Sequence, residues 1–293
     1  MKKILVTGAT GKQGSATAYE LLKNNFEVYA LTRNPHSAEA VNLEKAGAIL
    51  VKGDLENIEG LSDIFKKVDG LYLVLPPVWV SSIETDEKEA EIGIQTIKLA
   101  EEQGVKFILY SSVLGSDKQD LFRPKFKFTI EKHLLESNLS GAVIRPASFM
   151  ENLLLPSFGL GDGKFINPLP EEKAISWVAT NDIGTFARII FQNHTEFSGK
   201  TIDFGGDLFT PKQVLKLLEE KLNQPIDFVQ LPLEALYQQS ETFAKLVEMI
   251  DKEGYDPIDY ILISSWMPKL TGFGQWMDEI GIRKIKELHY KNN

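Results

Sequence analysis

The sequence predicts an α/β fold in which a doubly wound parallel sheet is followed by a smaller, mostly helical C-terminal lobe. Short apolar runs alternate with helical patterns through the first half of the 293 residues, which is typical of βαβ units. The runs are continuously apolar, as parallel strands covered on both faces require. After residue 150 this alternation stops. We therefore expect a first domain over residues 1–150 and a second over residues 151–293.

Six strands joined by helices are expected in the first domain. The apolar runs cover residues 4–6, 27–31, 48–51, 71–75, 106–110 and 142–144. One intervening helix carries an apolar stripe over residues 58–68, with Asn57 placed to cap its start. Another has its stripe at residues 90–97 and ends before Gly104, and a further helix covers residues 129–137.

The second domain begins with a segment rich in proline and glycine, residues 151–175, which indicates irregular structure. Thr210, Pro211 and Gln213 together predict a helix that starts with a capping box. Helical patterns cover residues 212–222, 232–251 and 273–288. We expect this part to form a substrate lobe that partly returns to the core of the first domain.

The composition excludes several classes of partner. The formal net charge of −9 argues against charge-driven binding to nucleic acid or to an anionic membrane surface. Cysteine is absent and the four histidines are scattered, so we expect neither a thiol nucleophile nor a metal site. No apolar run reaches the roughly 18 residues of a membrane span, and no secretory signal is evident. We expect a cytoplasmic protein that acts on a small molecule.

A glycine loop follows the first strand directly and opens a helix; it comprises Thr7, Gly8, Ala9, Thr10, Gly11, Lys12, Gln13 and Gly14. In this context the motif is typical of a Rossmann dinucleotide-binding domain. Gly8 permits the tight turn, Gly11 lets the backbone approach a pyrophosphate, and Gly14 allows close helix–sheet packing. The phosphates would bind free N–H groups at the start of the helix. We expect all residues from Gly8 to Gly14 to contact the cofactor.

The residue after the second strand selects between the two nicotinamide cofactors. An acidic side chain there would bind the ribose 2′-hydroxyl of NAD, whereas this chain has Arg33, whose guanidinium suits a 2′-phosphate. NADP(H) is therefore favoured over NAD(H). Ligands of such sheets lie beyond the carboxyl ends of the strands, where the sequence has Asp54, Leu75, Pro76, Pro77, Ser111, Ser112 and Arg145.

The usual acid of carbonyl reduction is missing. The Tyr-x-x-x-Lys spacing occurs only at Tyr19 and Lys23, in the first helix behind the glycine loop, where we interpret it as structural. Hydride transfer to a simple ketone needs an acid, but transfer to a quinone yields a phenolate-like oxygen with a pKa of about 10, which takes a proton from water. The site is therefore compatible with quinone reduction or with no turnover.

Several segments together resemble the NmrA-like family of atypical short-chain dehydrogenase/reductases. They are the glycine loop, residues 32–35, 51–54 and 105–112, and above all residues 144–153, where Ile-Arg-Pro precedes Phe-Met-Glu-Asn-Leu. By this resemblance Asp54 lies near the adenine, and Pro76 and Pro77 lie beside the nicotinamide ribose. Lys127 is similar to the family's active-site lysine, with Lys125 or Lys132 as alternatives. The nicotinamide end would be lined by Phe149, Met150, Glu151 and Asn152.

The resemblance implies one of two functions. The first is an NADPH-dependent oxidoreductase that reduces a quinone-like or other electron-poor small molecule, with Lys127 as its catalytic residue. The alternative is a redox sensor that binds NADP(H) with little or no turnover and signals to a protein partner. A sugar-nucleotide epimerase is disfavoured, because that chemistry also uses the missing tyrosine.

Overall fold

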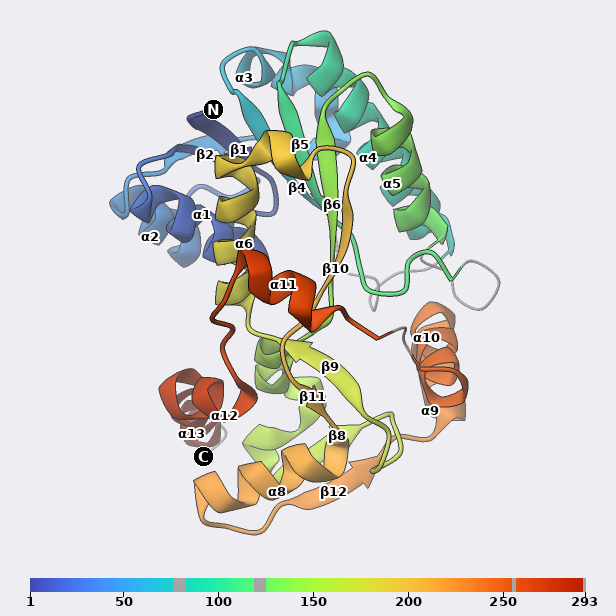
Figure 1. Cartoon of the computed structure of the whole chain (residues 1–293). Helices are drawn as coiled ribbons and strands as arrows, with labels where there is room; N and C mark the ends of the chain where they lie inside the picture. The colour runs from blue at the N-terminus through green and yellow to red at the C-terminus, as the bar shows by residue number, and fades with distance from the viewer. Residues whose placement is uncertain (76–82, 119–124, 255–256, 292–293) are drawn as a thin grey trace. The chain divides into compact units, whose positions relative to one another are not determined.

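The computed structural model describes residues 1–75, 83–118, 125–254 and 257–291 of the chain (Figure 1). These residues form two compact units. Of the described residues, the first unit holds 1–75, 83–118, 125–146 and 180–203, and the second holds 147–179, 204–254 and 257–291. After the sixth strand, the described chain thus passes into the second unit and comes back to the first over Thr180–Asp203.

The first unit is built on a sheet that has seven strands among the described residues, in the order β10-β6-β5-β4-β1-β2-β3. Strands β1 to β6 pair in parallel, and their order confirms the expected doubly wound Rossmann sheet. All six predicted strands are present, within one or two residues of their expected bounds: β1 (Lys3–Val6), β2 (Glu27–Thr32), β3 (Ile49–Lys52), β4 (Gly70–Val74), β5 (Phe107–Ser111) and β6 (Gly141–Pro146). The strand β10 (Thr201–Phe204) adds to the edge at β6.

Helices cover both faces of this sheet (Figure 1). On one face α1 (Lys12–Lys23) packs against α6 (Thr180–Gln192), so closely that a Cβ on Gly184 would lie 2.6 Å from the carbonyl oxygen of Ala16. On the other face lie α4 (Ile83–Glu102) and α5 (Lys125–Glu136). Their buried side chains, such as Ile97 and Ile130, join the core beneath the strands. Two shorter helices, α2 (Ala38–Lys45) and α7 (His194–Phe197), complete this unit together with the segment after β3.

The segment after β3 differs from its prediction. It forms the 3₁₀ helix η1 (Leu55–Leu61) and the short helix α3 (Ser62–Phe65). The cap is Asp54, whose carboxylate accepts a hydrogen bond of 3.1 Å from the backbone N–H of Glu56. Asn57, the predicted cap, lies at a kink with non-helical dihedral angles between two turns of this segment, and the first turn is capped by Asp54 instead.

The second unit contains mainly helices, together with small sheets. As predicted, Thr210 and Gln213 form a capping box at the start of α8 (Pro211–Leu222). The expected helix over residues 232–251 is divided at Ser240 into α9 (Leu233–Gln239) and α10 (Glu241–Lys252). The other helices are α11 (Tyr260–Trp266), α12 (Phe273–Trp276) and α13 (Ile282–Lys291), the last two joined by the π-helical turn η6 (Met277–Gly281).

Residues 151–175, expected to be irregular, form three 3₁₀ turns, η3 (Met150–Leu154), η4 (Pro156–Phe158) and η5 (Leu160–Asp162), and one strand, β8 (Lys164–Asn167). This strand pairs in parallel with β12 (Asp227–Gln230). A second small sheet has the order β11-β9-β7, from β7 (Ser148–Phe149), β9 (Ile175–Val178) and β11 (Leu208–Phe209). Within the four described ranges, every helix falls short of the length or apolarity that crossing a bilayer requires.

Candidate functional site

The glycine loop lies between β1 and α1, and two of its positions admit only glycine. Gly8 has a φ of 56°, in the left-handed region that side chains disfavour. At Gly14 a Cβ would lie 2.1 Å from the carbonyl oxygen of Gly8, far inside contact distance. The turn is closed by a 2.9 Å hydrogen bond from the N–H of Gly11 to the same carbonyl. Because both positions are glycine, the start of α1 packs directly against the turn with no side chain between them.

The side chain of Thr7 links the loop to β4 by hydrogen bonds. Its hydroxyl donates to the carbonyl oxygen of Val74 at 2.9 Å and accepts from the N–H of Val74 at 2.7 Å. The outer positions Thr10, Gly11 and Lys12 are exposed, whereas Ala9 is fully buried. A ligand can therefore approach the backbone at the start of α1, where the helix dipole favours an anion.

Gln13 links the loop to the carboxyl ends of two strands. Its side-chain oxygen accepts hydrogen bonds from Ser111 at 2.8 Å and from Tyr72 at 3.3 Å. The structure thus brings together two predicted site residues, Gln13 and Ser111, which are 98 positions apart in the sequence. Leu75, at the end of β4, is buried. Pro76 and Pro77 lie outside the described residues.

Arg33 follows β2 and Asp54 follows β3, and the two side chains differ in exposure and in hydrogen bonding. Arg33 is exposed, and its guanidinium has no partner within the part of the chain that the structure describes. Asn34 and Thr32 shape the turn beside it through hydrogen bonds to neighbouring backbone N–H groups. Asp54 is half-buried, and one of its carboxylate oxygens is already used as the cap of η1. Arg33 therefore presents an available cation at the edge of the sheet.

Lys127 is buried and ion-paired. It lies in the first turn of α5, and its ammonium donates to the carboxylate of Glu89 on α4; each side chain is 7% exposed. Lys132, one alternative to Lys127, is exposed, and its Nζ lies 3.9 Å from Oε1 of Glu136. The side chain of Lys125, the other alternative, is outside the described structure. Of the two described lysines, Lys127 alone is enclosed at the end of the helix nearest the strand ends.

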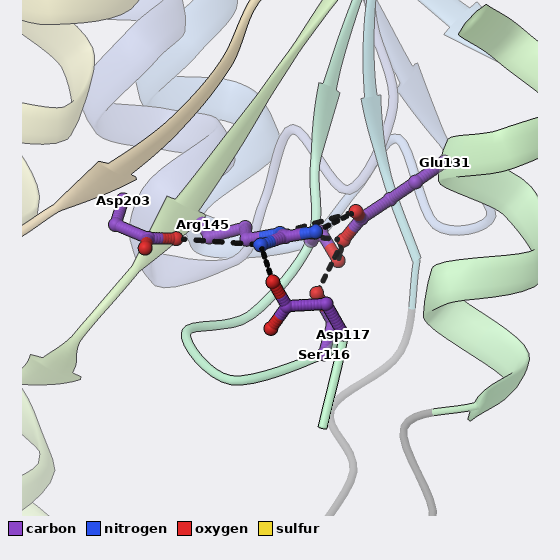
Figure 2. A network of polar contacts seen from close by, with 6 residues as sticks. Ser116, Asp117, Glu131, Arg145 and Asp203 are labelled. Atoms are coloured by element: carbon purple, nitrogen blue, oxygen red, sulfur yellow. Dashed lines mark hydrogen bonds and ion pairs between the residues drawn. The ribbon is translucent and has the colours of Figure 1, made fainter. Parts of the chain in front are cut away.

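A second buried network, which the sequence did not predict, surrounds Arg145 at the end of β6 (Figure 2). The guanidinium donates to both carboxylate oxygens of Glu131, at 2.7 Å from Nη2 to Oε2 and at 3.2 Å from Nε to Oε1, and to Asp117 at 2.7 Å. Two serine hydroxyls, from Ser112 and Ser116, also donate to Glu131. The network ties the loop after β5 to α5 and β6, so Arg145 supports the site instead of facing a ligand as predicted for the strand ends.

Neither Tyr72 nor Tyr19 has its pKa lowered toward neutral pH, as an acid of carbonyl reduction would require. Burial raises the pKa of Tyr72 to about 12. Burial together with a hydrogen bond to Glu39 raises the pKa of Tyr19 to about 12 as well, which is the opposite of the shift that a Tyr-x-x-x-Lys pair requires. The structural interpretation of Tyr19 therefore agrees with its environment. Over residues 1–75, 83–118, 125–254 and 257–291, no group of three His, Asp or Glu side chains is arranged to hold a metal ion.

The four residues predicted for the nicotinamide end, Phe149 to Asn152, belong to the second unit. Met150 is fully buried, and Asn152 is buried as well. The carboxylate of Glu151 accepts a 3.0 Å hydrogen bond from the indole N–H of Trp276. Their role at the cofactor stays a prediction.

The NmrA-like family model matches residues 1–277. An NmrA-like family domain-containing protein of Dictyostelium discoideum is 32% identical over 247 residues, which cover 78% of this chain and 80% of that protein. Quinone oxidoreductase 2 of Escherichia coli is 28% identical over 207 residues, 70% of this chain and 68% of that protein.

Solved structures share the fold. The crystal structure of a new type of NADPH-dependent quinone oxidoreductase from Escherichia coli has a TM-score of 0.75 at 21% identity, and the match covers 94% of this chain and 99% of that chain. NmrA, a negative transcriptional regulator crystallised with NADP, has a TM-score of 0.74 at 17% identity, with 98% of each chain covered. With a family model that spans nearly the whole sequence, the chain belongs to the NmrA-like family.

Proposed function

We propose that this protein binds NADP(H) at the glycine loop and uses NADPH to reduce a quinone-like or other electron-poor small molecule. The observation that carries the proposal is the contact between Gly8 and Gly14, where a Cβ would come within 2.1 Å of the backbone. This contact brings the start of α1 directly against the turn, where its backbone N–H groups would meet a pyrophosphate.

The chain offers a donor for each anionic part of the cofactor. Backbone N–H groups at the start of α1 would hold the pyrophosphate. Because the side-chain oxygen of Gln13 is held by Ser111 and Tyr72, its amide N–H₂ would be left to donate to a phosphate oxygen. Arg33 would hold the 2′-phosphate by paired N–H donors, which supports NADP(H) over NAD(H).

The acceptor class follows from the missing acid. When bound, NADPH supplies a hydride, and that hydride plus one proton from water would convert a quinone to a hydroquinone while leaving NADP⁺. Tyr72 stays protonated near neutrality because burial raises its pKa to about 12. A phenolate-like product with a pKa of about 10 needs no stronger acid than water, whereas an alkoxide would. The name of the Escherichia coli relative, quinone oxidoreductase 2, supports the same class.

The proposal is tested by following NADPH absorbance with a panel of benzoquinones and naphthoquinones, with NADH in parallel. We expect steady oxidation of NADPH that depends on both protein and quinone and that is slower with NADH. Tight NADPH binding without oxidation by any acceptor would contradict the reductase and match the redox-sensor alternative. Activity with NADH equal to that with NADPH would contradict only the assignment of Arg33.

A further inference from the structure

The ion pair between Lys127 and Glu89 lies between two helices that approach each other closely. One turn further along the same helices, a Cβ on Gly93 would lie 2.6 Å from Cδ1 of Ile130. Lys127 and Glu89 therefore occupy positions on the buried stripes of α5 and α4 where apolar side chains are the rule, and both are 7% exposed.

Stability alone does not explain a charged pair in this place. The desolvation of two buried charges offsets most of their attraction, and apolar side chains of similar size stabilise such positions as well or better. The position of Lys127 in the first turn of α5 adds a further cost, because the helix dipole disfavours a cation there. The pair is therefore expected to serve the ligand site.

The topology places the pair on a defined side of that site. In a βαβ unit the helix begins at the edge of the sheet where the preceding strand ends. Lys127 and Glu89 are near the starts of α5 and α4, so they lie toward the carboxyl ends of β5 and β4. The strand order puts β4 and β5 on one side of β1, and β2 with Arg33 on the other side. A dinucleotide whose pyrophosphate lies at β1 and whose 2′-phosphate lies at Arg33 extends its nicotinamide half toward β4 and β5.

A buried hydroxyl accompanies the pair. Tyr110, on β5, is fully buried. Burial raises the pKa of Tyr110 well above its ordinary value, and the nearby carboxylates of Glu89 and Glu131 raise it further. Tyr110 therefore carries no charge near neutral pH and does not balance the charge of Lys127. The Glu89 carboxylate does so.

Lys127 resembles the family's active-site lysine, and we infer that Glu89 is the positioning residue that holds its ammonium at the carboxyl ends of β4 and β5, where the nicotinamide–ribose half of NADP(H) would lie. This inference rests on the proposed function. The hydrogen bond from the Lys127 ammonium to the Glu89 carboxylate fixes where the ammonium lies. Without the Glu89 carboxylate the Lys127 ammonium would lose its fixed position. Cofactor binding would then have to order the ammonium, and the free energy of that ordering would weaken binding.

The test compares two ligands by calorimetry: NADPH, and adenosine 2′,5′-bisphosphate, which lacks the nicotinamide half. The variants are Lys127→Met, Glu89→Gln and the double variant. Each single variant is expected to bind NADPH about tenfold more weakly, the effect of losing a hydrogen bond to a charged group, and to bind the bisphosphate within about twofold of wild type. Adding Glu89→Gln to Lys127→Met is expected to change NADPH affinity no further, because Glu89 acts through Lys127.

Two further variants separate this role from a structural one. Glu89→Asp shortens the carboxylate arm and is expected to give an intermediate loss, even if Lys127→Met fails to fold. Glu20→Gln breaks a partly buried pair with Arg188 on the opposite face of the sheet and is expected to leave NADPH affinity unchanged. Lower thermal stability with wild-type affinity for both ligands in the Lys127 and Glu89 variants would overturn the inference. A wild-type protein that binds neither ligand would overturn the proposed function, and this inference with it.

Discussion

In a Gly14→Ala variant the added Cβ would lie 2.1 Å from the carbonyl oxygen of Gly8 and 3.1 Å from Cα of Ala9. Both are backbone atoms, so no side chain can move aside. Because an ordinary carbon contact is about 3.5 Å, the start of α1 must move by roughly 1 Å from the turn. Overpacking of this kind costs about 1–3 kcal/mol of the free energy of unfolding.

The same movement should also weaken cofactor binding. A displacement of about 1 Å misaligns at least one backbone N–H that would donate to the pyrophosphate, and a hydrogen bond to a charged group contributes about 1.5–3 kcal/mol. We therefore expect the affinity of Gly14→Ala for NADPH to fall about 10- to 100-fold. Calorimetric titration with NADPH measures the affinity, and urea denaturation measures the free energy of unfolding.

Gly274→Ala is the matched control, because a Cβ at that position meets no atom within 4 Å. It should bind NADPH as wild type does. If Gly14→Ala were folded and bound NADPH within about threefold of wild type, the loop would not hold the pyrophosphate in the way proposed here, since a contact this short leaves no room for the wild-type geometry.

Three other variants test the edge and the core of the first unit. Arg33→Ala should lose at least about tenfold in affinity for NADPH and little for NADH, because only NADPH carries the 2′-phosphate; equal losses would refute the assignment. Arg145→Met should lower the free energy of unfolding in urea by about 3 kcal/mol, because it leaves the buried Glu131 carboxylate without its cation. Adding Glu131→Leu should restore much of that loss, and no recovery would contradict the explanation.

Asp69→Asn should lower stability by about 1–2 kcal/mol at pH 7, because hydrogen bonds from Lys106 and from two backbone N–H groups hold the pKa of Asp69 well below its usual range. Since that pKa is lowered on folding, the stabilisation is complete above the unfolded value of about 3.9 and is lost as the pH falls through the folded value. The free energies of unfolding of wild type and Asp69→Asn, measured by urea denaturation at several pH values, should therefore approach each other below about pH 4. A difference between the two proteins that stays constant down to pH 3 would refute this sign.

The sheet and the glycine loop could be predicted because local sequence determines them. A buried parallel strand is a short run of apolar residues, so β1 to β6 were visible individually. The loop was visible because Gly8 and Gly14 follow the first strand at a fixed spacing. The small sheets of the second unit gave no such signal: β8 and β12 are four residues each, mix polar with apolar residues, and pair residues 63 positions apart in the sequence.

The buried charges were missed, although the sequence carries a signal for them. Lys127 and Glu131 are one helical turn apart, and both fall on the apolar stripe of α5 that contains Ile130 and Leu134. Glu89 falls in the same way on the stripe of α4. A charged residue on an apolar stripe indicates a buried partner, but the partner itself depends on which helices meet, and the sequence pattern does not contain that information.

If backbone amides of the glycine loop hold the pyrophosphate and Arg33 holds an additional phosphate, the wild-type protein should bind NADPH at a single saturable site. Calorimetric titration with NADPH, repeated with NADH and checked by the change in nicotinamide fluorescence, measures this. We expect binding of NADPH and an affinity for NADH at least about tenfold lower. Neither heat nor a fluorescence change with either cofactor would contradict the assignment of this site.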